Sequence, residues 1–112
     1  LIHLKWLNYT DDLLPIADCL LKAGADHGAT GENPVIVGAR KADIIAGPIG
    51  IVIADSLYGE ITPKMALAVA QSNAKRILIP FNHCDNIIAG VSDLSVGKLI
   101  QSAVEEIRKI LA

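Results

Sequence analysis

The stretch DIIAGPIGIVIADSLYGE, residues Asp43 to Glu60, decides the fold predicted for this chain. Its first part, Asp43 to Ala46, is apolar on consecutive positions, which is typical of a strand covered on both faces in a parallel sheet. The segment Gly47 to Gly50, with its proline and two glycines, then interrupts the strand. In open α/β sheets, ligands bind outside the carboxyl ends of the strands. We therefore expect functional side chains in the loop that follows.

Composition limits the class of protein. The 112 residues are enough for one domain with its own core, so we expect a single α/β domain over residues 1–112. Apolar residues make up 52% of the chain and aromatic residues only 4%, which favours an aliphatic α/β interior over a β-sandwich. A net charge of −2 provides no basic field for a phosphate backbone, so nucleic acid is not an expected partner.

The cysteines and apolar runs give no sign of a metal site or a membrane segment. Cys19 and Cys84 lie far apart, outside any metal-ligand spacing, and we expect both to be reduced thiols. Apolar runs are too short to span a bilayer and no secretory signal opens the chain. We expect a cytoplasmic protein without metal or membrane partner, and no cofactor can be assigned.

Alternating residues predict a first strand over Leu1–Asn8, followed by a helix that Thr10 caps and that Gly24 ends in a left-handed conformation. Asn33 as the N-cap and Pro34 as the first helical residue predict a short helix that reaches Arg40. The small-residue loop before this helix would present free backbone amides to an anion.

The second half of the chain has a similar helix start, in which a capping residue is followed by proline. Thr62 and Pro63 open a helix over Lys64–Ser72 that is apolar nearly all round and should be buried. Strands are expected over Arg76–Pro80 and Asn86–Val91. A last amphipathic helix begins near Ser95, with Leu99, Ile100, Ala103, Val104, Ile107 and Leu111 inward. This order predicts a three-layer Rossmann-like or flavodoxin-like sandwich with a mainly parallel sheet.

The candidate site is a pocket formed by three loops at one edge of the sheet. Asp55 lies between apolar segments, so we expect it to be partly buried with a pKa tuned for acid–base catalysis. The alternative is an aspartate that caps its loop by accepting bonds from backbone amides. The expected ligand-binding residues are Thr30, Gly31, Glu32, Asn33, Gly47, Gly50, Ser56, Asn82 and Asn86.

The run from Leu21 to Val91 resembles an uncharacterised family of short bacterial α/β proteins known as a domain of unknown function. The blocks that carry the resemblance are Lys22–Asp26, Gly28–Asn33, Ala42–Ser56, Gly59–Pro63 and Ile77–Pro80, with Asn82 and Cys84. The resemblance implies an additional first strand with a glycine-rich, dinucleotide-type loop. This chain lacks that segment, so we expect it to be N-terminally incomplete; the alternative is that Leu1–Asn8 takes the place of a later strand of the family sheet.

A second resemblance is to the methylglyoxal synthase type of fold, in which an Ala-Thr-Gly loop holds a phosphate and a Gly-Pro-x-Gly segment follows a strand. Ala29-Thr30-Gly31 and Gly47-Pro48-Ile49-Gly50 match in order. Ile51 occupies the position of the catalytic aspartate expected from that resemblance, which argues against the activity.

Three functions follow as hypotheses. The first is a binding domain for a small molecule, either a nucleotide or a phosphorylated metabolite, because no complete nucleophile–base or metal constellation is visible. The second is a small enzyme of the methylglyoxal-synthase type that acts on a sugar or triose phosphate with Asp55 as acid/base. The third is a structural subunit of a homo-oligomer, which we expect to form through the apolar Lys64–Ser72 helix and the strand that contains Trp6.

Overall fold

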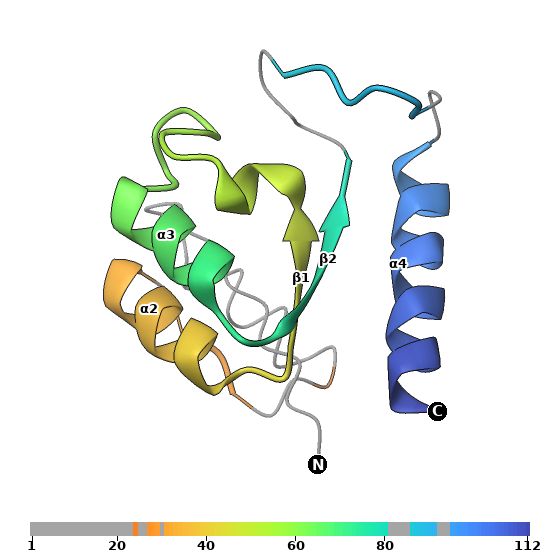
Figure 1. Cartoon of the computed structure of the whole chain (residues 1–112), viewed down its shortest axis with the longest axis horizontal. Coiled ribbons are helices and arrows are strands. Elements are labelled where there is room, and N and C mark those ends of the chain that lie inside the picture. The colour runs from red at the N-terminus through yellow and green to blue at the C-terminus, as the bar shows by residue number, and fades with distance from the viewer. Residues whose placement is uncertain (1–23, 25–26, 30, 81–85, 92–94) are drawn as a thin grey trace.

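A computed structural model describes residues 24, 27–29, 31–80, 86–91 and 95–112 (Figure 1). The predicted first strand and the helix before Gly24 lie outside the described residues. The described elements, in chain order, are α2 (Glu32–Lys41), β1 (Ile44–Pro48), the 3-10 helix η1 (Ile49–Val52), α3 (Pro63–Gln71), β2 (Lys75–Ile79) and α4 (Val96–Leu111).

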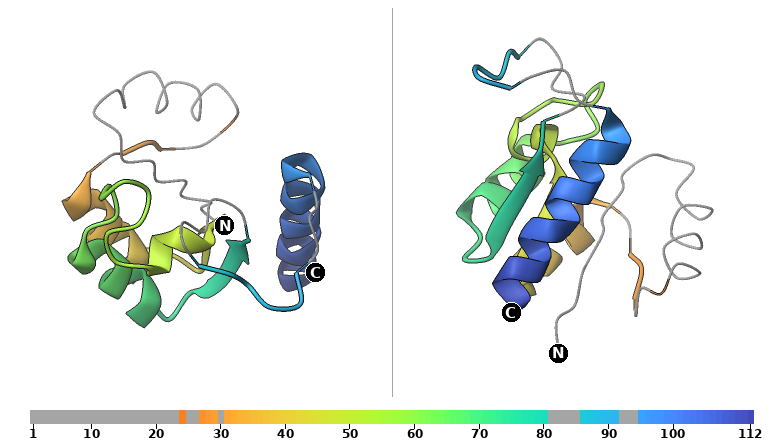
Figure 2. Two further views of the ribbon diagram at one scale, coloured as in Figure 1. Left: turned by 90° about the horizontal axis from the view of Figure 1, so that it is seen from above. Right: turned by 90° about the vertical axis from the view of Figure 1, so that its right-hand side faces the viewer.

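The two strands form a small parallel sheet. Ile44 is paired with Lys75 at one end of the ladder and Pro48 with Ile79 at the other. Because parallel neighbours need a crossover connection, α3 runs between the strands and returns the chain to the same end of the sheet. Helices α2 and α3 lie on one side of the sheet, and α4 runs beside β2 on the other side (Figures 1 and 2). This arrangement of helices and parallel strands confirms the predicted α/β class.

The core lies between the sheet and the pair α2 and α3. Val35 from α2 and Ile61 from the turn before α3 are its most deeply buried side chains. They are joined by aliphatic side chains from β1, η1 and α3, as expected for a domain with few aromatic residues. The other buried members of this cluster are Ala39, Ile45, Ile51, Met65, Ala66, Val69 and Ala74.

Two helix starts agree with the prediction and one differs. The Thr62 hydroxyl accepts a hydrogen bond from the Met65 amide at 3.2 Å, and Ser95 caps α4 in the same way. Helix α2, however, begins at Glu32 with Gly31 as its N-cap, so the prediction that Asn33 is the cap was wrong. Pro34 is tolerated at the third helical position because the first amides of a helix have no intrahelical partner.

The apolar side chains of α3 and α4 are less buried than the sequence predicted. In α3, Leu67 is 55% exposed, so the apolar character of this helix does not correspond to burial all round. In α4, Ala103 is buried and Leu99 and Ile107 are half-buried, whereas Ile100, Val104 and Leu111 are exposed. Helix α4 therefore contacts β2 along only part of its apolar face.

The predicted strand over Asn86–Val91 is not formed. These residues are coil followed by a turn, and the amide of Val91 donates to the carbonyl oxygen of Ile88 at 3.4 Å. Ile87 is 93% exposed, so the apolar residues of this segment do not pack as a strand would, and the prediction of a strand was wrong. Within the part of the chain that the structure describes, no helix combines the length and apolar character needed to cross a membrane.

Candidate functional site

In the view of Figure 1, β1 and β2 end and α4 begins at the top, whereas α2 and α3 begin at the left. The carboxyl ends of the strands are the edge at which parallel α/β proteins bind ligands. The loop after β1 starts at this edge, and the start of α2 lies apart from it (Figures 1 and 2). Thr30 and Asn82 lie outside the described residues, and Asn86 is exposed in the coil before α4.

The amino end of α2 differs from those of α3 and α4 because its N-cap residue, Gly31, has no side chain that could cap it, and among the described residues no side-chain cap is present. Gly31 has a φ of +111°, a backbone conformation that residues other than glycine rarely adopt. The first backbone hydrogen bond of the helix runs from the Val35 amide to the Gly31 carbonyl at 3.3 Å. The amides of Glu32 and Asn33 precede this bond and point out of the helix end. They are donors at the positive end of the helix dipole.

Glu32 contributes a carboxylate to the same turn; Glu32 is half-buried and Asn33 is exposed. A carboxylate in the first turn interacts favourably with the helix dipole. It also makes the turn bifunctional, because backbone amides donate hydrogen bonds and the carboxylate accepts them.

Three other predicted ligand-binding residues hold the loop after β1 together. The Ser56 hydroxyl is buried and donates to the Gly50 carbonyl oxygen. A Cβ at Gly50 would lie 3.1 Å from Ser56 Oγ, and one at Gly47 would lie 3.2 Å from Cδ1 of Ile51. These glycines therefore permit close internal packing, and the Ser56 proton is already engaged within the protein.

The loop from Ile53 to Ile61 has an unusual backbone. Asp55, Leu57 and Tyr58 all have φ between +55° and +64°, which costs roughly 1–2 kcal/mol for each residue that is not glycine. Two backbone bonds close the loop, from the Asp55 amide to the Ile61 carbonyl at 2.7 Å and from the Ile61 amide to the Ser56 carbonyl at 3.3 Å.

This backbone explains why Asp55 is exposed, so the expectation of a partly buried carboxylate was wrong. The chain reverses direction at Asp55, and its apolar neighbours in sequence do not surround it. The alternative of a loop-capping carboxylate also finds no support, since no described residue donates a hydrogen bond to the Asp55 side chain. The carboxylate is presented to solvent.

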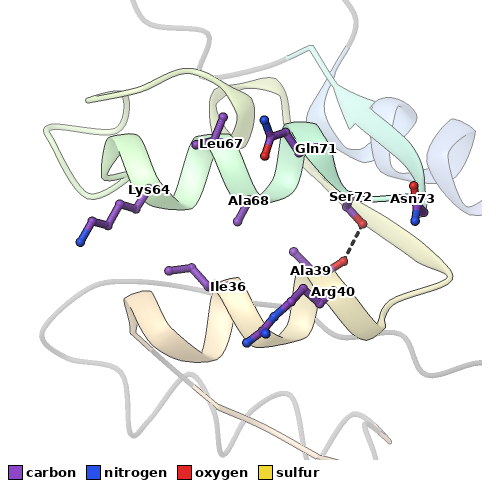
Figure 3. Close-up of a pocket in the computed structure, with 9 residues that line it drawn as sticks. All are labelled: Ile36, Ala39, Arg40, Lys64, Leu67, Ala68, Gln71, Ser72 and Asn73. Carbon is purple, nitrogen blue, oxygen red and sulfur yellow. Dashed lines mark hydrogen bonds between the residues drawn. The ribbon is translucent and has the colours of Figure 1, made fainter.

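A groove on the outer side of α2 and α3 was not anticipated from the sequence. It has a volume of about 470 Å³ and lies between the two helices, with Arg40 and Lys64 on its rim (Figure 3). At one end, the Ser72 hydroxyl donates to the Ala39 carbonyl at 2.6 Å and ties the helices together. The lining residues are Ile36, Ala39, Arg40, Lys64, Leu67, Ala68, Gln71, Ser72 and Asn73.

The helical spacing of these residues was the signal that could have revealed the groove. Lys64, Leu67, Ala68 and Gln71 occupy positions i, i+3, i+4 and i+7 and so share one face of α3. The prediction that this helix is buried nearly all round assigned the apolar members of this face to the core. Among the described residues, no three His, Cys, Asp or Glu side chains come together in a group that could hold a metal ion.

Comparison with known proteins gives one match. A family model described as a domain of unknown function (DUF3842) matches residues 16–112. No curated protein and no solved structure matches the chain.

Proposed function

The chain belongs to the DUF3842 family, a domain of unknown function, and we propose that it binds a phosphorylated small molecule at the amino end of α2. The observation that carries this proposal is the contrast between helix ends. Helices α3 and α4 satisfy a first-turn amide with Thr62 and Ser95, whereas α2 begins at Gly31 without a side-chain cap. A phosphate oxygen would accept from the amides of Glu32 and Asn33 and would interact favourably with the helix dipole.

The Glu32 carboxylate restricts the ligand class. It repels a bare anion at this helix end but accepts hydrogen bonds from hydroxyl groups. A ligand that combines a phosphate with sugar hydroxyls satisfies both the amides and the carboxylate. A nucleotide or a sugar phosphate therefore fits this turn better than inorganic phosphate does.

We further propose that the complete sheet is larger than the β1–β2 pair and forms a Rossmann-like three-layer sandwich. The parallel pairing of β1 and β2 supports this proposal, as do the helices on both sides of the pair. In such a sheet, β1 would be a central strand, which agrees with the burial of Ile44 and Ile45.

A thermal-shift screen tests the binding proposal. Purified protein is heated with AMP, ribose 5-phosphate, adenosine and inorganic phosphate. A ligand at a hundredfold excess over its Kd stabilises the fold by about 2.7 kcal/mol, which raises the Tm of a domain of this size by roughly 10 °C. The proposal predicts a rise with AMP or ribose 5-phosphate and a much smaller one with adenosine. The absence of a rise with either phosphorylated compound would contradict it.

Two glycine variants form a matched pair for this screen. Gly31→Ala places a methyl group at the helix end, and Gly24→Ala imposes the same strain elsewhere because its φ is +108°. Neither Cβ meets a heavy atom closer than 3.8 Å, so both variants should lose similar stability. Only Gly31→Ala should lose the rise produced by the phosphorylated ligand.

The strained loop supports a second candidate function, an enzyme acting on a sugar or triose phosphate. Left-handed residues other than glycine cluster at functional sites, where surrounding structure maintains them. Here they present the Asp55 carboxylate to solvent on the side where the strands end. If Asp55 is an acid/base group, Asp55→Asn should abolish turnover of such a substrate while its binding persists. Equal turnover in Asp55→Asn would exclude this role.

A further inference from the structure

We propose that the groove between α2 and α3 is a second binding site, separate from the amino end of α2, for a small organic acid with an apolar body. The groove lies on the outer face of the helix pair, whereas the phosphate site proposed above lies at the end of α2 (Figure 3). Its volume of about 470 Å³ is within the range typical of small-molecule sites.

The interior of the groove supplies apolar contact. Ile36 and Ala39 from α2 lie opposite Ala68 from α3, and Leu67 of α3 also lines the groove. Leu67 is 55% exposed and Ile36 and Ala68 are half-buried, so an aliphatic or aromatic group placed here would remove apolar surface from water. The hydrogen bond from Ser72 to Ala39 fixes the spacing between the helices at one end, so this surface exists before a ligand binds.

The charged residues of the groove favour an acidic ligand. Arg40 and Lys64 are the charged residues among its lining, and no carboxylate lines it. Neither cation forms a salt bridge with a described residue. The side-chain amides of Gln71 and Asn73, which also line the groove, can donate further hydrogen bonds to a carboxylate or sulfonate.

The same charges argue against a second copy of this chain as the occupant. A two-fold arrangement that buries the groove against itself would bring Arg40 and Lys64 of both copies together, and like charges oppose such contact. The exposed apolar side chains of α4 are not a better partner for it, because Arg108 lies one turn from Val104 on the same face. A small acid satisfies the groove without this repulsion.

Isothermal titration of the full chain with octanoate tests the proposal, and 1-octanol is the neutral control of equal chain length. Octanoate should bind with a stoichiometry of one, and 1-octanol at least severalfold more weakly. Arg40→Gln and Lys64→Gln should each weaken octanoate binding about two- to fivefold, as expected for exposed ion pairs. Leu67→Asp should abolish it. Lys75→Gln, an exposed cation on β2 outside the groove, should leave the affinity unchanged.

Any of four results would overturn the proposal. The first is no saturable octanoate binding, and the second is equal affinity for octanoate and 1-octanol. The third is that the Arg40→Gln and Lys64→Gln variants bind octanoate with the same affinity as the control variant Lys75→Gln. Because Asn33→Asp alters only the amino end of α2, octanoate binding that is lost in this variant would also assign the probe to the other site and overturn the proposal.

Discussion

The hydroxyl of Ser56 donates a hydrogen bond to the carbonyl oxygen of Gly50, and both residues are buried. This bond joins the loop after β1 to η1 and helps to fix the left-handed turn that exposes Asp55. Ser56, which was predicted to bind a ligand, therefore has a structural role in the loop that carries Asp55.

Ser56→Ala should lower the free energy of unfolding by about 1–3 kcal/mol, because it leaves the buried Gly50 carbonyl without its donor. Urea denaturation followed by circular dichroism measures the loss. The control is Ser102→Ala on the exposed side of α4, which should change stability by less than about 0.5 kcal/mol. Equal stability of the two variants would show that the Ser56 bond does not stabilise the loop.

Tyr58→Gly should raise stability. Tyr58 is fully exposed with a φ of +57°, so its side chain adds strain without burial. Relief of about 1–2 kcal/mol is partly offset by the entropy of glycine in the unfolded chain, about 0.5–1 kcal/mol. The matched variant Tyr58→Ala retains the strain and should show no gain. If both variants unfold at the same urea concentration, the backbone of this loop is not strained.

Ile61→Ala should cost about 2–5 kcal/mol of stability, because it opens a cavity where the side chain is 1% exposed. Leu67→Ala is the control. Because Leu67 is 55% exposed, its truncation removes little buried surface and should lower the free energy of unfolding by less than about 1 kcal/mol. Comparable losses in the two variants would contradict the position of the core between the sheet and the pair α2 and α3.

Glu32→Gln should change ligand preference. Removal of the negative charge relieves repulsion at the end of α2, so inorganic phosphate should bind more tightly. A sugar phosphate loses a charged acceptor for its hydroxyl groups and should gain less or bind more weakly. Titration calorimetry with phosphate and ribose 5-phosphate measures both. An identical change for the two ligands would mean that Glu32 does not contact the sugar.

Local signals in the sequence were sufficient for much of the fold. The apolar run before Gly47 predicted β1, the RILI run predicted β2, the Thr62 cap predicted the start of α3, and the amphipathic spacing predicted a helix from near Ser95. These predictions were correct because strand burial and helix capping depend on residues that are close together in the chain.

Other features depend on contacts or backbone conformations that the sequence does not reveal. Leucine and tyrosine have no preference for positive φ, so nothing at Leu57 or Tyr58 predicted the turn that exposes Asp55. Asn33-Pro34 is typical of a cap and first helical residue, yet Gly31 occupies the N-cap position two residues earlier. The α2–α3 groove requires the relative placement of two helices, which periodicity within one helix does not provide.

The most direct test of the central claim is an amide NMR titration of the ¹⁵N-labelled chain with AMP. We predict saturable shifts at the amides of Gly31, Glu32 and Asn33, with the amides of Leu67 and Ala68 unaffected. Asn33→Asp adds a charge that favours the helix but repels phosphate, so it should retain or raise stability while it weakens AMP binding roughly tenfold, or ~1.4 kcal/mol. Shifts absent from the start of α2, or AMP affinity unchanged in Asn33→Asp, would contradict the account.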